Sequence, residues 1–114
     1  MHELSLAGGI LKIVENTARR EAFTRVTALR LEAGPLAGVE VRALRFALEA
    51  LAPGTLLAGA RIDIDTPPAQ AWCMACAATV SISARGDPCE LCGTYQLQAT
   101  GGDELRIIDM MVED

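Results

Sequence analysis

Two short stretches, Cys73–Cys76 (CMAC) and Cys89–Cys92 (CELC), decide how the second half of this sequence is organised. They hold all four cysteines of the 114-residue chain. Two residues between paired cysteines let both sulfurs reach one ion from a tight turn, and residues 77–88 are enough for a hairpin. The sequence therefore predicts one tetrahedral, structural zinc site whose ligands are Cys73, Cys76, Cys89 and Cys92.

Other uses of four cysteines fit this sequence less well. Disulfides are rare in the cytoplasm, where we place the chain because it has no membrane-length apolar run and no signal-peptide pattern. A dithiol redox centre needs only one CxxC pair. Iron in a rubredoxin-like site would use the same four thiolates and remains an alternative. Trp72 precedes the first pair, and we expect it to pack against the metal module as a shield.

Helical and extended patterns alternate outside the cysteine segment. Apolar residues recur every three or four positions over residues 3–18, and again over residues 41–51 until Pro53 stops the pattern. Gly8 and Gly9 each cost the first helix roughly 1 kcal/mol, so we expect another backbone to pack closely there. Three other segments read as strands: residues 26–32, 61–65 and 105–112.

The order of these elements predicts an α/β fold. Strand, helix and strand joined by short links favour a right-handed parallel pair with helices packed over the sheet. We expect a two-layer sandwich of a small mixed sheet with two helices, plus an inserted zinc-ribbon-like module. Residues 1–66 and 103–114 would form the α/β domain, and residues 67–102 would form the four-cysteine module.

Charge and motif content exclude several functions. Ten basic and fifteen acidic side chains leave a net charge of -5, which is the wrong sign for a protein that follows a phosphate backbone. No nucleophile-base pair, glycine-rich phosphate loop or serine triad pattern is present. The sequence therefore predicts neither a nucleic-acid partner nor an enzyme.

The N-terminus offers a second group of metal donors. The amine of Met1, the amide nitrogen of His2 and the His2 imidazole Nδ1 can close adjoining five- and six-membered chelate rings around one ion. Nitrogen donors in a plane suit Ni(II) or Cu(II) better than zinc. Glu3 could add a fourth donor through its amide or carboxylate. From the residues alone, a frayed terminus without metal is the competing interpretation.

Three motifs together resemble the HypA/HybF family of nickel-insertion accessory proteins for hydrogenase maturation. They are MHELS at residues 1–5, PCELCG at residues 88–93 and GDELRI at residues 102–107. The likeness spans the full length, including element order and the inserted cysteine module. Two positions depart from the family pattern, since Glu90 replaces a common proline and Ala77 replaces a frequent glycine.

The resemblance implies a cytoplasmic nickel metallochaperone that binds Ni²⁺ at Met1, His2 and Glu3 and keeps Zn²⁺ in the four-cysteine module. It implies that the GTPase HypB and the large subunit of [NiFe]-hydrogenase are partners, and it leaves a role with urease maturation proteins open. The alternative function is a zinc-stabilised protein–protein adaptor without a mobile metal. No membrane partner is expected, and both a monomer and a homodimer are compatible with the sequence.

Overall fold

The computed structural model describes residues 2–114, which form two compact units. Unit 1 contains the residues up to Leu31, Val39–Ile64 and Ile107–Asp114, and unit 2 contains Glu32–Gly38 and Asp65–Arg106. The elements follow in the order α1 (His2–Glu21), β1 (Arg25–Ala33), α2 (Val41–Leu51), β2 (Arg61–Asp65), β3 (Ala69–Cys73), β4 (Ala78–Ile82), β5 (Leu97–Gly101) and β6 (Leu105–Glu113).

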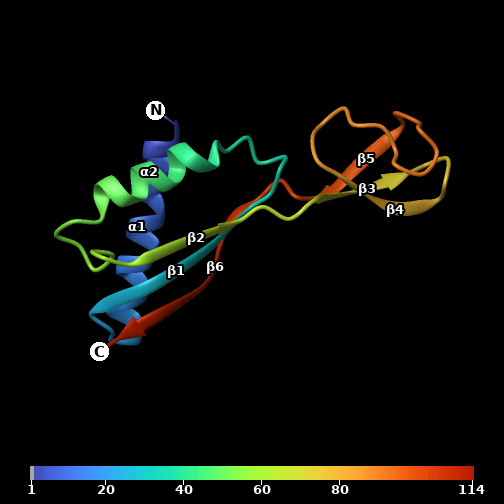
Figure 1. The fold of residues 1–114 in the computed structure, drawn as a ribbon. Coiled ribbons are helices and arrows are strands. Elements are labelled where there is room, and N and C mark those ends of the chain that lie inside the picture. The colour runs from blue at the N-terminus through green and yellow to red at the C-terminus, as the bar shows by residue number, and fades with distance from the viewer. Residues whose placement is uncertain (1) are drawn as a thin grey trace. The chain divides into compact units, whose positions relative to one another are not determined.

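The sheet of unit 1 is mixed, with the strand order β2-β1-β6. β1 and β2 run in the same direction, and β6 runs against them (Figure 1). An ion pair joins Arg25, at the start of β1, to Glu113, at the end of β6. A second ion pair joins Arg30 to Asp109 further along the two strands, which is the order expected of an antiparallel pair. The expected mixed sheet is therefore confirmed.

Helices α1 and α2 bury apolar stripes that follow the helical period. The buried residues of α1 are Ala7, Ile10, Val14 and Ala18, and those of α2 are Leu44, Ala47 and Leu48. The Glu40 carboxylate caps α2 by accepting the Ala43 amide proton at 2.6 Å. Both predicted helices are present. Helix α1 runs from His2 to Glu21 and is therefore longer than the expected residues 3–18.

The glycines of α1 do not pack as expected. A Cβ added at Gly8 or Gly9 would meet no atom within 4 Å. Among residues 2–114, no other backbone segment comes close enough to Gly8 or Gly9 to offset their cost to the helix. The prediction of close packing there is wrong, and the two glycines simply weaken the helix.

The sheet of unit 2 is a three-stranded antiparallel sheet with the order β4-β3-β5. Its strands lie within residues 67–102, the segment that we expected to form the zinc-ribbon-like module. One face carries a small core, which consists of Leu36, Ala69, Ala71, Cys73, Val80, Ile82 and Cys89. Two cysteines are thus core residues of this unit.

Two glycines explain why Glu32–Gly38 belongs to unit 2. The amide of Gly34 donates to the Glu104 carbonyl at 2.9 Å, and the amide of Leu36 donates to the Gly102 carbonyl at 2.8 Å. A Cβ on Gly34 would lie 2.1 Å from the Gly102 oxygen, so only glycine allows this approach. Residues that we expected in the α/β part, Glu32–Gly38 and 103–106, are held in unit 2 by these contacts.

Neither helix in the described part of the chain is both long enough and apolar enough to cross a membrane.

Substituting Gly34 by alanine tests the close approach of the two backbone segments. Because the Cβ would collide with backbone atoms, which cannot move as a side-chain end can, we expect the free energy of unfolding to fall by about 1–3 kcal/mol. Chemical denaturation of the zinc-loaded chain, followed by amide NMR signals of both units, measures the change.

Gly8→Ala is the matched control, since its Cβ enters open space. Here the same substitution should raise stability by up to about 1 kcal/mol, because alanine is the better helix former. A Gly34→Ala protein as stable as the parent chain would contradict the packing that we describe.

Candidate metal centre

The first CxxC pair lies in the turn between β3 and β4. Cys73 is the last residue of β3 and is fully buried, and Cys76 follows in the turn with its side chain half-buried. The amide of Cys76 donates to the Cys73 sulfur at 3.3 Å. Ala77 then adopts a positive φ of 51°, which reverses the chain into β4. The hairpin therefore forms around the first pair, whereas the sequence placed it between the pairs.

The second CxxC pair forms a similar turn. The amide of Leu91 donates to the Cys89 sulfur at 3.4 Å, and the amide of Gly93 donates to the Cys89 carbonyl at 2.9 Å. Gly93 has a φ of +77°, so the residue after each pair is left-handed. Cys89 is buried and Cys92 is exposed.

The four sulfur atoms converge on one point. They all lie within 4.8 Å of one another, with 3.7 Å between Cys73 and Cys92 and 3.9 Å between Cys76 and Cys89. Sulfurs at the corners of a tetrahedron with Zn–S bonds of ~2.3 Å are separated by ~3.8 Å. All four cysteines are free thiols, so no disulfide competes. The cluster is suited to a structural zinc ion.

Proximity pushes the thiol pKa values of the cluster apart. The pKa of Cys76 is raised to about 12, mainly by hydrogen bonds with the Cys92 and Cys73 sulfurs. The pKa of Cys89 is lowered to about 7, chiefly because the Cys92 amide donates to its sulfur, while burial acts in the opposite direction. Four thiolates so close together repel one another unless a cation neutralises them. A divalent metal removes that conflict.

The N-terminal candidates lie on the first turn of α1. His2 is the first residue of the helix and is exposed. Glu3 is half-buried, and its carboxylate accepts the Glu40 amide proton at 3.3 Å, directly before α2. Met1, the third predicted nickel ligand, lies outside the described residues. Within residues 2–114, the four cysteines are the only group of three or more potential metal ligands of the types His, Cys, Asp and Glu.

Comparison with known proteins decides the family. Residues 1–112 match the family described as HypA, hydrogenase/urease nickel incorporation, metallochaperone. This chain belongs to the HypA family. Its members are nickel metallochaperones and maturation factors, so the expectation that the chain is not an enzyme agrees with the family.

Relatives and solved structures support the HypA assignment. Hydrogenase maturation factor HypA of Polaromonas naphthalenivorans is 68% identical over 114 residues, covering 100% of this chain and 99% of that protein. The same factor of Cupriavidus necator is 66% identical, covering 100% and 96%. A solution structure of the Ni metallochaperone HypA from Helicobacter pylori aligns over 97% of both chains, with a TM-score of 0.68 and 18% identity, and so shares the fold.

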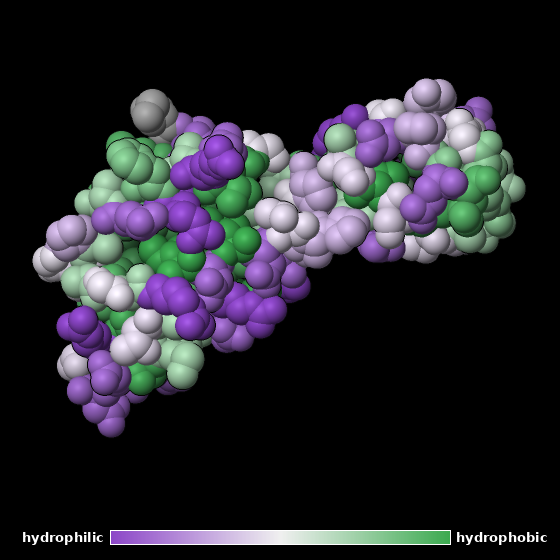
Figure 2. Space-filling model, viewed as in Figure 1, coloured by the Kyte–Doolittle hydropathy of each residue, from purple (hydrophilic) through white to green (hydrophobic). Residues whose placement is uncertain are grey.

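Trp72 does not shield the HypA cysteine cluster as expected. Trp72 is 37% exposed. Burial alternates along β3, so that Ala71 and Cys73 are buried while Trp72 is not. Because successive strand residues face opposite sides, Trp72 lies on the side away from Cys73. Other large apolar side chains of unit 2 are exposed as well: Met74, Leu91 and Tyr95. Figure 2 shows hydrophobic residues on the surface of this unit.

Sequence reasoning missed two features of the site. The first is the three-stranded sheet that supports the cysteines, although the alternation in residues 69–73 could have signalled β3. The second is the hydrogen bond between Glu3 and the backbone before α2. No local sequence signal predicts that contact, because the two residues are 37 positions apart.

Replacing Cys73 by alanine tests the metal centre. Three remaining thiolates cannot close the tetrahedron, so we expect zinc content to fall from about one ion per chain to near zero. Unit 2 should then lose its structure, because Cys73 is also a core residue. Elemental analysis and the amide NMR spectrum report both effects.

Met74→Ala is the matched control, since Met74 lies in the same CxxC turn and is 65% exposed. It should keep its zinc. Unchanged zinc content in Cys73→Ala would exclude Cys73 as a ligand.

Ala77→Gly tests the backbone strain after the first pair. An L-residue in the left-handed region costs ~1–2 kcal/mol, so glycine should stabilise zinc-loaded unit 2 by about 1 kcal/mol. We expect slower zinc loss to a chelator than in the parent chain. Ala75→Gly, which lies in the same turn without a positive φ, should give no such gain.

Proposed function

We propose that this chain carries Ni(II) at its N-terminus and delivers it to the large subunit of [NiFe]-hydrogenase. The ligands would be the Met1 amine, the His2 amide nitrogen and imidazole, and Glu3. The observation that carries the proposal is the position of His2, an exposed histidine that opens α1.

The start of a helix supplies amide groups that a metal can use. The first four N–H groups of a helix have no intrahelical acceptor, and α1 begins at His2. Coordination by the His2 amide nitrogen would therefore break no helical hydrogen bond. Together with the amine and imidazole Nδ1, it places three nitrogen donors in one plane, which is the geometry that Ni(II) accepts.

The same position favours release as well as binding. The positive end of the α1 dipole opposes a cation, which weakens the site unless the amide proton is lost. Glu3 offsets part of this effect with its negative charge in the first turn. A carrier must give up its ion, so a weak, exposed site suits a delivery role better than a closed one.

The four cysteines would serve a different purpose. A site with four protein ligands has no open position for water, substrate or a transfer partner. Two of its sulfurs are buried in the core of unit 2. We therefore assign zinc to structure and nickel to transfer.

The family description supports partners in hydrogenase maturation. We propose that the GTPase HypB assists the transfer and that the hydrogenase large subunit receives the nickel. Copper would bind the same donors more tightly by the usual affinity order, so selectivity for nickel would come from metal supply and these partners.

Nickel titration of four forms tests the proposal: the native chain, His2→Ala, a form with extra residues before Met1, and Ser5→Ala. Calorimetry is done on zinc-loaded protein, so that nickel cannot occupy the cysteines. We expect His2→Ala and the extended form to bind nickel about tenfold more weakly or worse. Ser5→Ala, an exposed change on the same helical turn, should bind like the native chain.

Equal one-site affinity in all four forms would rule out the N-terminal site. A native chain that retains zinc but binds no nickel would favour the alternative function, a zinc-stabilised adaptor. Without nickel, the His2→Ala chain should have the same melting temperature as the parent chain, because His2 is exposed and contributes little packing.

A further inference from the structure

The four cysteines of unit 2 differ in their accessibility. Cys73 and Cys89 are buried and belong to the core of the unit, and Cys76 is half-buried. Cys92 is the one exposed cysteine of the four. A reagent in solution therefore meets Cys92 before it meets the other three zinc ligands.

Zinc coordination directs a reagent to the sulfur atoms. A bound divalent ion holds its cysteine ligands as thiolates, and the thiolate is the nucleophilic form of cysteine. Four protein ligands leave no open position on the ion, so a reagent can react only at a ligand sulfur. Susceptibility to oxidation follows thiolate character and exposure. Because all four ligands are thiolates, exposure decides which sulfur reacts first, and it favours Cys92.

A second thiolate lies next to Cys92. The Cys92 sulfur is 3.7 Å from the Cys73 sulfur. The two sulfurs of a disulfide are ~2.0 Å apart, so a shift of under ~2 Å joins them. Cys73 is held by pairing with both neighbouring strands, β4 and β5, whereas Cys92 lies in a turn between β4 and β5. We therefore expect Cys92 to move toward Cys73.

We propose that Cys92 is the residue at which a hydroperoxide oxidises zinc-loaded unit 2, and that Cys73 then forms a disulfide with it. In the first step the Cys92 sulfur bonds to the terminal peroxide oxygen, the O–O bond breaks and the leaving oxygen takes a proton from water. Cys92 becomes a sulfenic acid, and the hydroperoxide is reduced to an alcohol or water. In the second step the Cys73 thiolate attacks the Cys92 sulfur, the S–O bond breaks and hydroxide leaves.

The disulfide removes two of the four zinc ligands. Cys76 and Cys89 alone cannot complete a tetrahedron, so the module loses its ion. Oxidation at one exposed sulfur thereby converts a closed structural site into one that releases zinc. The inference rests on the zinc centre and is independent of nickel binding at the N-terminus, so the two proposals can fail separately.

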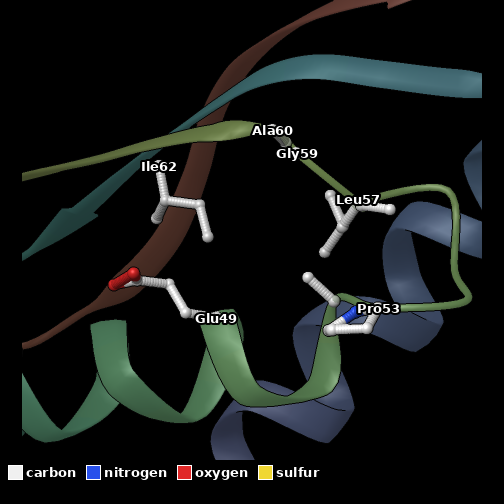
Figure 3. A pocket seen from close by; sticks show the side chains of 8 residues that line it. Glu49, Pro53, Leu57, Gly59, Ala60 and Ile62 are labelled. Carbon is white, nitrogen blue, oxygen red and sulfur yellow. The ribbon is translucent and has the colours of Figure 1, made fainter.

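The pocket at the C-terminal end of α2 provides an internal reference in unit 1. It has a volume of about 380 Å³, and Figure 3 shows Leu57 and Ile62 opposite Glu49. None of the residues that line it is a cysteine or a methionine, so peroxide has no side chain to oxidise there. The amide NMR signals of residues 49–62 should therefore stay unchanged while those of unit 2 shift.

The test treats the full zinc-loaded chain with hydrogen peroxide. A chromophoric chelator follows zinc release, and mass spectrometry maps the modified cysteines. With dimedone present, which traps sulfenic acids, we expect the first adduct on Cys92. Without the trap, a Cys73–Cys92 disulfide should form, and zinc should fall from about one ion per chain to near zero. A first adduct on another cysteine, a different disulfide, or cysteine oxidation without zinc release would overturn the proposal.

Three variants assign the reaction to Cys92. Cys92→His keeps four metal ligands, since three cysteines and one histidine also form structural zinc sites, and it should release zinc severalfold more slowly. Cys76→His is the matched control and should release zinc like the parent chain. Met74→Ala removes the exposed thioether of the first CxxC turn and should also leave the rate unchanged. Equal rates for Cys92→His and the parent chain, or release that stops in Met74→Ala, would refute the role of Cys92.

Discussion

Four cysteine sulfurs held within 4.8 Å of one another are the constraint on which unit 2 depends. Four thiolates this close together repel one another unless a cation neutralises them, and hydrogen bonds with the Cys92 and Cys73 sulfurs raise the pKa of Cys76 to about 12, which favours its protonated form. The core of this unit is small, and Cys73 and Cys89 belong to it. A metal cross-link therefore replaces hydrophobic area that so small a core cannot supply.

The two predicted metal sites meet opposite physical demands. The cysteine cluster is formed by two turns and a sheet, and its four ligands leave no position for exchange. The proposed nickel site uses an exposed histidine at a helix end, where the dipole works against a bound cation. Tight retention suits the ion that maintains a fold. Weak, accessible coordination suits the ion that is passed on.

A glutamate side chain lies near each end of helix α2. Its N-terminus is capped by Glu40, and the Glu3 carboxylate accepts the Glu40 amide proton, so the start of α1 is tied to the start of α2. Its C-terminus ends before Pro53 without a basic residue and borders the pocket that contains Glu49. The first arrangement positions a proposed nickel ligand.

The sequence by itself determined the elements whose signals are local. Both helices, the strands β1, β2 and β6, and the ligand spacing of the cysteine pairs follow from apolar periodicity and CxxC spacing, which act over a few neighbouring residues. Only the tertiary structure decided that Glu32–Gly38 joins unit 2, that Trp72 lies on the face of β3 opposite Cys73, and that the Glu3 carboxylate accepts a backbone proton before α2. These outcomes depend on contacts between residues far apart in the chain. Backbone proximity at Gly34 and Gly102, and the face that a strand residue takes, arise only when separate segments pack together.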